Sequence, residues 1–441
     1  MINKYDIVIV GGGPAGLMAA RAAGEEGLKV ALLERKKDIS KIHRTCGGAI
    51  NVNESSFGEI VRYDDEKGEF AFQNNGFTVR YCGTFQNIYG FHIYSPGGKR
   101  LEFGNFSKLR TNPKKNRLGV ATNKGLILKN LIEESERLRV SVFSNRNVFS
   151  VAKNSKNVTV ECEDGTIFEG TFVIAADGIN SRIARVLKLN KNRSFFGTTR
   201  DVSIEIEGTD CPDPDGFLFM FTPKGVFSMI PMAEKNCYLV SASTNRRDIK
   251  PLDLINYLAN DDPTFSQWYK KSKILHDRTA CVVTLMSPLE KPYKDNVLLI
   301  GDACWRREIS NLGALCTGWK AGKTIAKALN DGKPNEEGVK EYLDWYQEYY
   351  YEPHGKRKQT GRNFLEYLAS EDIDYLAELP DQEFEQTMDI FKVVNAIGRT
   401  YGKLMTRIYE ERPDVMEKLL KVRENMEEDM KKQIKWGFRT V

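Results

Sequence analysis

The sequence predicts an α/β fold, and three observations support this prediction. First, an apolar strand, a glycine-rich turn, a helix and a second strand follow one another between Tyr5 and Glu34. Second, two further apolar strands end in an acidic residue beside glycine, at Asp177-Gly178 and Gly301-Asp302. Third, two blocks rich in alternating apolar and polar residues interrupt this pattern, and a charged helical region follows them.

The first strand is expected over Tyr5 to Val10, and it continues directly into Gly11-Gly12-Gly13-Pro14-Ala15-Gly16. The first glycine permits a tight turn, Gly13 leaves room for a diphosphate, and Gly16 lets the helix pack closely on the strand. The helix N-terminus offers free N–H groups to that diphosphate. Glu34 closes the second strand, about 20 residues further on, where a carboxylate accepts hydrogen bonds from ribose hydroxyls. The order of these parts predicts a dinucleotide site; Glu34 disfavours NADP and leaves FAD and NAD open.

The remaining elements are assigned from periodicity and turn residues. Helices are expected over 17–23, 124–137, 252–258, 265–271, 322–329, 341–351 and 415–435. Strands are expected over 28–33, 77–81, 89–94, 101–103, 141–143, 148–151, 158–160, 171–176, 202–206, 217–221, 226–230, 238–240 and 297–300. The basic run from Lys108 to Arg117 is interpreted as a solvated loop.

Composition excludes several classes of protein. The 441 residues are 41% hydrophobic and 28% charged, and a net charge of +5 is too mild to indicate nucleic acid. No apolar run has the 18 or so residues of a membrane span, and no signal peptide precedes the first strand, so a cytoplasmic protein is expected. The eight cysteines form no Cys-x-x-Cys pair and the four histidines are scattered, so no metal site is expected.

The motifs resemble those of a known superfamily. The glycine fingerprint, Asp177-Gly178-Ile179-Asn180-Ser181 and Gly301-Asp302-Ala303 occur in the order seen in FAD enzymes of the para-hydroxybenzoate hydroxylase fold. Within it, Arg44-Thr45-Cys46-Gly47-Gly48 resembles the cysteine-bearing loop of the geranylgeranyl reductase family, whose members saturate isoprenoid double bonds with reduced FAD. The resemblance covers about residues 1–330. It implies FAD as cofactor and a Rossmann-like FAD-binding domain of the GR2/PHBH type.

The resemblance also implies roles for single residues. Asp302 would bind the ribityl or diphosphate region, and the main chain at Gly313 would approach the flavin pyrimidine edge. Cys46 would lie beside the isoalloxazine and is the catalytic candidate, although a buried, inert cysteine is the alternative. The expected cofactor-binding residues are Gly11, Gly13, Pro14, Ala15, Gly16, Glu34, Arg35, Arg44, Lys124, Asp177, Gly301, Asp302, Gly313 and Ala314.

Two departures from the family pattern stand out. Lys124 occupies a position where the family usually carries arginine, which keeps the charge but loses the bidentate fork. The loop from Cys304 to Ala314 replaces the small residues, proline and glycines of the family. Trp305, Arg306 and Arg307 in this loop would offer a site to an anionic substrate. A structural replacement that keeps the same chain path is the equally weighted alternative.

Three regions are expected in the chain. Residues 1–55, 108–190 and 281–330 form a discontinuous FAD-binding domain. Residues 56–107 and 191–280 form a β-rich substrate domain, and residues 331–441 form a C-terminal helical region. Trp345 and the Tyr349-Tyr350-Tyr351 run in that region are expected to pack on the core, with peripheral membrane contact as the alternative.

The leading hypothesis is a flavoprotein that reduces a carbon–carbon double bond of an isoprenoid-like or other unsaturated small molecule. The alternatives are an aromatic monooxygenase, an electron-transfer flavoprotein that serves quinone, and a non-enzymatic FAD scaffold. The hypothesis of an electron-transfer flavoprotein that serves quinone is disfavoured, because residues 331–441 contain no cysteine to bind an iron–sulfur cluster. No second glycine fingerprint is present for a permanently bound nicotinamide, so the donor is NAD(P)H that visits briefly or a reduced ferredoxin or flavodoxin. The sequence leaves the oligomeric state open.

Overall fold

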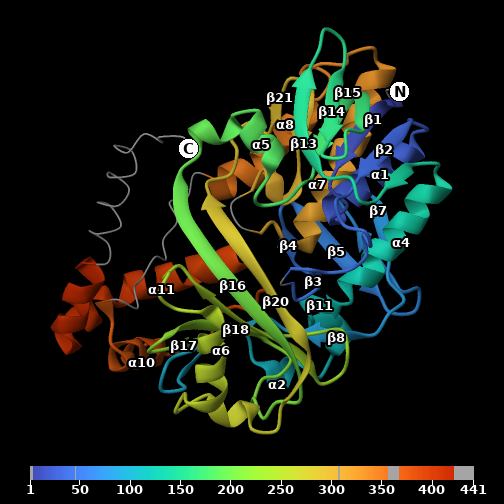
Figure 1. The fold of residues 1–441 in the computed structure, drawn as a ribbon. Helices are drawn as coiled ribbons and strands as arrows, with labels where there is room; N and C mark the ends of the chain where they lie inside the picture. Colours follow the sequence, from blue (N-terminus) through green and yellow to red (C-terminus); the bar gives the residue numbers. More distant parts are fainter. Residues whose placement is uncertain (1–2, 45, 306–307, 356–366, 422–441) are drawn as a thin grey trace.

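The largest sheet contains the strands of the glycine fingerprint (Figure 1). The computed structural model describes residues 3–44, 46–305, 308–355 and 367–421. Within these residues, β12, β2, β1, β15 and β22 are parallel neighbours, and β14, β13 and β21 pair antiparallel in the same eight-stranded sheet. The strands are β1 (Asn3–Val10), β2 (Val30–Leu33), β12 (Ser141–Phe143), β13 (Val148–Lys153), β14 (Val158–Cys162), β15 (Ile167–Ala175), β21 (Tyr293–Lys294) and β22 (Val297–Leu299). The predicted α/β fold is confirmed.

Three helices cover this sheet close to the glycine fingerprint. They are α1 (Pro14–Glu25), α4 (Lys124–Arg137) and α7 (Ser310–Asn330), and α1 packs against both of the others. The α4 bounds agree with the prediction. The prediction for α7 is too short, since the helix begins at Ser310 and not near Gly322. The missed turns hold small and polar residues such as Ser310, Asn311 and Gly313, which are weak helix formers, and tertiary packing makes them helical.

A seven-stranded sheet lies beside the first one (Figure 1). Its order is β10-β9-β17-β18-β19-β16-β20. Its strands are β9 (Phe91–Tyr94), β10 (Arg100–Glu102), β16 (Phe195–Glu207), β17 (Phe217–Thr222), β18 (Gly225–Pro231), β19 (Cys237–Thr244) and β20 (Lys273–Met286). Because β17 pairs parallel with β9, strands from both β-rich blocks of the sequence share this sheet. The division of the whole chain into domains stays a prediction.

The rest of the first β-rich block forms smaller sheets. One contains β3 (Ala49–Asn51), β8 (Phe85–Ile88) and β11 (Gly119–Thr122); the other contains β4 (Ser55–Ser56), β5 (Glu59–Asp64), β6 (Glu69–Phe72) and β7 (Phe77–Arg80). The second of these packs on the nucleotide-side core, where Phe77 stacks on Trp319 of α7 with ring centroids 4.8 Å apart. Strands from the expected substrate block therefore help to cover α7.

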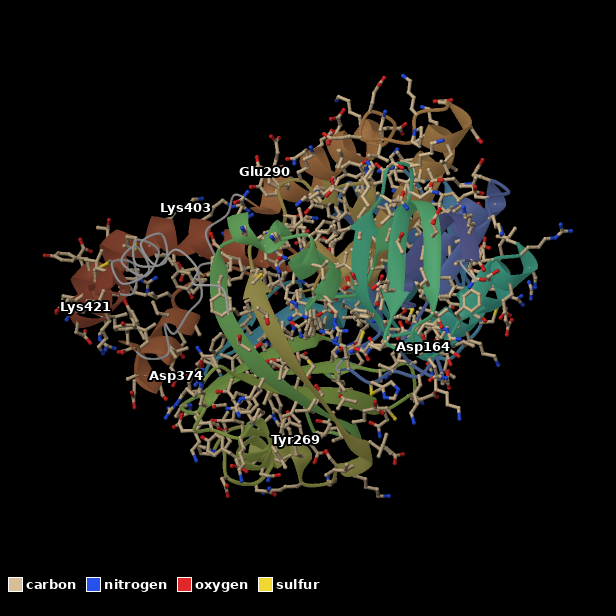
Figure 2. The ribbon with its side chains drawn as sticks, turned by 45° about the horizontal axis from the view of Figure 1, so that its top comes forward. Asp164, Tyr269, Glu290, Asp374, Lys403 and Lys421 are labelled. Carbon is tan, nitrogen blue, oxygen red and sulfur yellow. The ribbon has the colours of Figure 1, made fainter. Side chains whose placement is uncertain are left out.

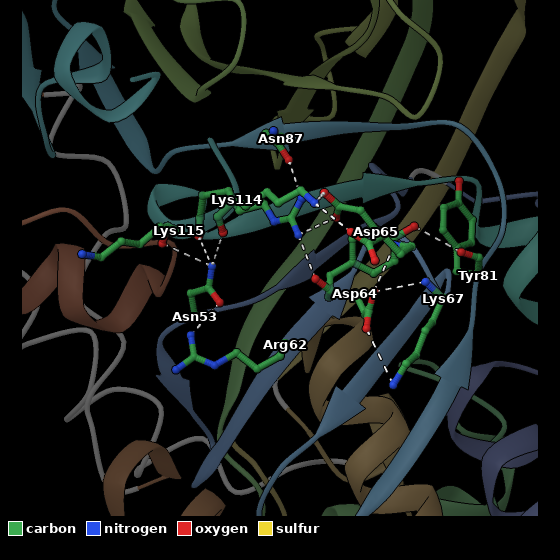
Figure 3. Close-up of polar contacts among 12 residues, drawn as sticks. Asn53, Arg62, Asp64, Asp65, Lys67, Tyr81, Asn87, Lys114 and Lys115 are labelled. Carbon is green, nitrogen blue, oxygen red and sulfur yellow. Dashed lines mark hydrogen bonds and ion pairs between the residues drawn. The ribbon is translucent and has the colours of Figure 1, made fainter. Parts of the chain in front are cut away.

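The basic run is more ordered than a solvated loop. It contains α2 (Phe106–Leu109) and α3 (Pro113–Asn116), whose N-caps are Asn105 and Asn112. Buried Arg117 donates to Asp65 at 2.6 Å, to the Tyr63 carbonyl at 2.8 Å and to Asn87 at 3.2 Å (Figure 3). Charge and asparagine count alone suggested a loop, but these caps and tertiary contacts order the segment.

The C-terminal region is helical, as predicted. It contains α8 (Lys340–Tyr346), the π-helical η4 (Gln347–Gly355), α10 (Ser370–Glu378) and α11 (Ile390–Glu411). Tyr350 is fully buried, and Trp345, Tyr349 and Tyr351 are partly buried against the same core, which confirms that this aromatic cluster packs on the core. The predicted helix over 415–435 lies in part outside the described residues. The remaining short helices are α5 (Arg182–Val186), α6 (Pro251–Asn260), η1 (Leu189–Asn192), η2 (Ser266–Tyr269) and η3 (Gly301–Ala303).

One buried histidine of the seven-stranded sheet makes stability depend on pH. His92 is 1% exposed and stacks on Phe106, and its Nε2 lies 3.9 Å from the Asp213 carboxylate. Burial lowers the pKa of His92 to about 4 despite the opposing charge of Asp213. In the unfolded chain, His92 is therefore protonated below about pH 6.5. In the native protein, His92 is protonated only near pH 4.

We expect wild-type stability to fall progressively between about pH 6.5 and pH 4, by roughly 3 kcal/mol from this group. The His92→Gln variant should lack this component. Urea unfolding at a series of pH values measures the free energy of unfolding of both proteins. Subtracting the two values at each pH removes the contribution of the carboxylates, because both proteins share it. Parallel pH profiles would contradict the expectation.

Candidate active site

The parallel register brings the predicted motifs to one edge of the eight-stranded sheet. The C-terminal residues of β2, β1, β15 and β22 lie side by side in register. Glu34, Gly11, Asp177 and Gly301 follow these four strands directly or after one residue. Ligands of open α/β sheets bind outside the carboxyl ends of the strands. This edge is therefore the candidate site.

The glycine turn has the close approaches that its sequence implies. Gly11 has a φ of +108°, and a Cβ there would lie 2.2 Å from the Ala176 oxygen. A Cβ on Gly16 would lie 1.9 Å from the Gly11 oxygen. At Gly13, by contrast, no heavy atom lies within 4 Å of a Cβ position. The helix α1 then begins at Pro14 without a side-chain cap, so open space and free N–H groups meet at its N-terminus.

The Glu34 carboxylate holds this turn in place. Its Oε2 accepts a 2.6 Å hydrogen bond from the Gly12 N–H, and its Oε1 accepts one of 2.9 Å from the Lys36 N–H. Glu34 is 7% exposed, whereas the next side chain, Arg35, is exposed. Each carboxylate oxygen keeps a second lone pair, which leaves Glu34 able to accept from a ribose hydroxyl.

We expect Glu34→Ala to weaken FAD binding roughly tenfold to a hundredfold, because two main-chain donors and the ribose lose a charged acceptor. Fluorescence titration of the apoprotein with FAD measures the dissociation constant. Asp38→Ala is the matched control, since this exposed carboxylate accepts hydrogen bonds within its own turn, from Ser40 and the Lys41 main chain. Equal constants for the Glu34→Ala and wild-type proteins would contradict the assignment.

Asp177 points into its own loop. Its Oδ1 accepts from the Ser181 hydroxyl at 2.6 Å, and its Oδ2 accepts from the Ile183 N–H at 3.1 Å, at the start of α5. Burial raises the pKa of Asp177, and these hydrogen bonds oppose the rise. The carboxylate thus serves a helix start, and its role as a cofactor ligand stays a prediction. Arg44 reaches the same edge, with its Nη1 3.5 Å from where a Gly178 Cβ would be.

Asp302 links β22 to the start of α7. Its Oδ1 accepts a 2.9 Å hydrogen bond from the Ile309 N–H. Burial raises the pKa of Asp302, against the nearby charges of Arg44 and Lys124. At the beginning of α7, which holds Gly313 and Ala314, the Ile309 side chain provides no cap. The Gly313 N–H, however, donates to the Ser310 hydroxyl at 3.2 Å, so this main-chain group already has a partner.

Cys46 lies beside the first residues of α4 and α7, in a loop that also contacts the seven-stranded sheet. A Cβ on the neighbouring Gly47 would lie 2.7 Å from Ile230 of β18, so this loop packs on the seven-stranded sheet. The Lys124 Nζ lies 3.5 Å from the Cys46 sulfur, and the Asn311 Nδ2 lies 3.9 Å from it. Asn311 was missed in the sequence; its only signal was its place in the unusual loop from Cys304 to Ala314.

The structure corrects one expectation about that loop. Trp305 is fully buried, with edge-on ring contacts to Phe57 at 5.7 Å and Tyr350 at 5.8 Å. A side chain in the core cannot bind an anionic substrate, so the structural alternative holds for Trp305. Its carbonyl accepts from the buried Arg193 guanidinium. Arg306 and Arg307 lie outside the described residues.

The residues at this edge fit FAD. Gly13 borders open space, the uncapped N-terminus of α1 would supply N–H groups, and Arg44 and Lys124 would supply positive charge for a diphosphate. Glu34 would supply the ribose acceptor. Among the described residues, no three histidine, cysteine or acidic side chains come together as a metal site would require.

Comparison with known proteins finds family models and relatives that are similar to this chain. Residues 6–39 match the family model "FAD dependent oxidoreductase", and residues 121–310 match "FAD binding domain". Digeranylgeranylglycerophospholipid reductase 2 of Methanopyrus kandleri is 26% identical over 94% of this chain and 98% of that protein. The digeranylgeranylglycerophospholipid reductase of Methanocaldococcus jannaschii is 26% identical over 90% and 95%, respectively.

Solved structures share the fold. A geranylgeranyl bacteriochlorophyll reductase-like protein from Thermoplasma acidophilum superposes with a TM-score of 0.68 at 18% identity, over 93% of this chain and all of the other. The halogenase PltM superposes with a TM-score of 0.59 at 14% identity, over 77% of this chain and 73% of its own.

The fold, the site and the family matches define an FAD-dependent oxidoreductase. Over most of its length the chain is similar in sequence to digeranylgeranylglycerophospholipid reductases, in keeping with the resemblance of the Cys46 loop.

Proposed function

We propose that this oxidoreductase reduces a carbon–carbon double bond of an isoprenoid-type lipid with reduced FAD. The observation that carries the proposal is the place of the Cys46 loop, between the FAD edge and the apolar side of the seven-stranded sheet. Ile230, next to this loop, belongs to a packed cluster of buried apolar side chains, which gives the loop apolar surroundings: Ile88, Leu118, Ala121, Ile230, Leu239 and Met388. The names of the relatives in Methanopyrus and Methanocaldococcus support the same substrate class.

Bound FAD would supply the hydride, and the protein supplies binding, orientation and charge. The open side of Gly13 and the N-terminus of α1 would hold the diphosphate, and Glu34 the ribose. The positive end of the α7 helix dipole would stabilise negative charge on the reduced ring. Cys46 is the proposed substrate-side catalytic residue, and the apolar cluster would keep water from the reacting carbons.

The first experiment is anaerobic. The FAD-loaded protein is reduced with NADH, with NADPH and with a reduced ferredoxin or flavodoxin, which also identifies the electron donor. An unsaturated isoprenoid lipid is then added. We expect reoxidation of the flavin together with a product two mass units heavier per bond reduced. A reduced flavin that no unsaturated lipid reoxidises would contradict the proposal.

An aromatic monooxygenase remains the alternative, because the fold is shared with flavin-dependent halogenases. Oxygen uptake separates the two activities. A monooxygenase consumes oxygen in a substrate-stimulated manner and incorporates one of its atoms, whereas the proposed reductase gives a saturated product without oxygen incorporation.

Peripheral membrane contact is proposed through α11. None of the described helices has the length and apolar character to cross a bilayer. On α11, however, Val394, Met405 and Tyr409 are 47%, 37% and 66% exposed along one side, and Lys403 lies on the same helix (Figure 2). Cosedimentation with phosphatidylcholine–phosphatidylglycerol vesicles tests this contact: Val394→Ser/Met405→Ser should reduce binding, and equal binding would exclude α11. Cell fractionation tests the expected cytoplasmic location.

A further inference from the structure

Two hydrogen-bond donors from different helices converge on the Cys46 sulfur. The Lys124 ammonium, on the first residue of α4, lies 3.5 Å from Sγ. The Asn311 amide, in the first turn of α7, lies 3.9 Å from Sγ and donates to the Ala49 carbonyl at 3.0 Å. A sulfur that faces two N–H donors is placed as an acceptor, and negative charge on it is favoured by both.

The fold holds Lys124 in this position. The Asn123 side chain caps α4 by accepting from the Leu126 N–H, which fixes the helix start. Gly48 has a φ of +67° and a Cβ there would lie 2.1 Å from the Thr122 oxygen, so the Cys46 loop runs tightly against the end of β11. The contact between sulfur and ammonium therefore joins two constrained segments.

The surroundings keep Lys124 charged. Burial lowers the pKa of Lys124, but the sulfur of Cys46 and the carboxylates of Glu308 and Asp302 outweigh this effect, and the pKa is raised overall. Other cations face the same region: Lys36, whose pKa burial lowers and whose ammonium lies near Lys124, and Arg44, near Asp302. Within the part of the chain that the structure describes, Lys124 is the cation in direct contact with the sulfur.

We propose that Lys124 is a positioning residue that acts through Cys46, by stabilising the negative charge left on the sulfur when Cys46 gives its proton to the substrate. This inference rests on the proposed double-bond reduction. One alkene carbon receives the hydride that reduced FAD supplies, and the other receives the Cys46 proton as the S–H bond breaks. The alkene is reduced by two electrons, the flavin is oxidised by two, and water then reprotonates the sulfur.

Lysine suits this role better than the arginine expected from the family. The ammonium is a compact point charge that can face a single sulfur, whereas the guanidinium fork is built for two oxygen acceptors. A unit charge this close to the sulfur has an electrostatic effect large enough to change its reactivity by one or more powers of ten at an effective dielectric constant of about 20.

Alkylation of the FAD-loaded protein by iodoacetamide tests the contact without any substrate. Mass spectrometry follows Cys46 and, in the same sample, the exposed Cys82 as an internal reference. We expect Lys124→Met to slow alkylation of Cys46 roughly tenfold to a hundredfold and to leave Cys82 unchanged. Lys124→Arg, which keeps the charge, should restore the rate to within about threefold. An unchanged Cys46 rate in Lys124→Met would overturn the proposal.

A second measurement separates this inference from the proposed function. Reoxidation of the reduced flavin by the unsaturated lipid is compared in Cys46→Ala, Lys124→Met and the double variant. If Lys124 acts through Cys46, its replacement adds no further loss once Cys46 is alanine; a multiplicative loss would overturn the inference. If no protein reduces the lipid, the proposed function fails while the alkylation result still stands. If Lys124→Met does not retain FAD, the rate of Cys46 alkylation is compared in Lys124→Gln and wild type, and in the apoproteins of Lys124→Met and wild type.

Discussion

Replacing Gly318 with alanine is expected to destabilise the protein and to empty its FAD site. Gly318 is on α7, and a Cβ there would lie 2.2 Å from the Ala15 oxygen of α1 and 3.0 Å from its carbonyl carbon. Because both partners are main chain, the two helices must move apart. Overpacking of this kind costs about 1–3 kcal/mol or more, and the displaced residue lies in the turn proposed to bind the diphosphate.

We therefore expect Gly318→Ala to lower the melting temperature and the FAD-to-protein ratio together, with FAD binding weakened about tenfold or more. Circular dichroism and the flavin absorbance of the purified protein measure the two effects. Gly398→Ala is the matched control, because Gly398 is also helical but no atom lies within 4 Å of its Cβ position. It should be neutral or stabilising by up to about 1 kcal/mol. Equal behaviour of the two variants would contradict this account of α1–α7 packing.

Removing the Trp305 side chain is expected to cost about 3–5 kcal/mol, which is typical of truncating a fully buried tryptophan. Trp305 has no exposed surface, and it packs edge-on against the stacked rings of Phe57 and Tyr350. The main-chain N–H of Trp305 donates to the Asp302 carbonyl at 3.2 Å, so the side chain is anchored directly at the turn after β22. Trp305→Ala should therefore lower both stability and FAD content.

Urea unfolding and flavin absorbance test this expectation. Trp305→Phe should retain much of the packing and lose less stability than Trp305→Ala. Phe149→Ala removes an aromatic side chain that is 43% exposed on β13, and it should change stability far less. A small effect of Trp305→Ala, similar to that of Phe149→Ala, would contradict the structural role of this residue.

Local chemistry was enough to predict the nucleotide half of the fold. The strand over Tyr5 to Val10, the glycine turn and α4 need only a short window of sequence, since β-branched runs, glycines and helical periodicity each have a local cause. The start of α7 could not be found in this way. Its first turns pack against α1, and that contact is made across about 300 residues of sequence.

The site was predictable in part for the same reason. Gly11, Asp177 and Gly301 follow strands, and the ends of parallel strands must meet at one sheet edge. The burial of Trp305 and the convergence of Lys124 and Asn311 on Cys46 carry no local signal. These contacts depend on side chains from distant segments that pack around the chain after β22.

By itself, the sequence determined that this chain forms an α/β dinucleotide-binding fold, and its resemblance to a known family indicated FAD. Only the tertiary structure showed which charged groups face the sulfur of Cys46. It also showed that Trp305 of the unusual loop is buried in the core. The physical reason is the separation along the sequence over which each kind of interaction acts. Turn chemistry and hydrophobic periodicity act within a few residues, whereas packing and electrostatic contacts depend on distances that only the folded chain defines.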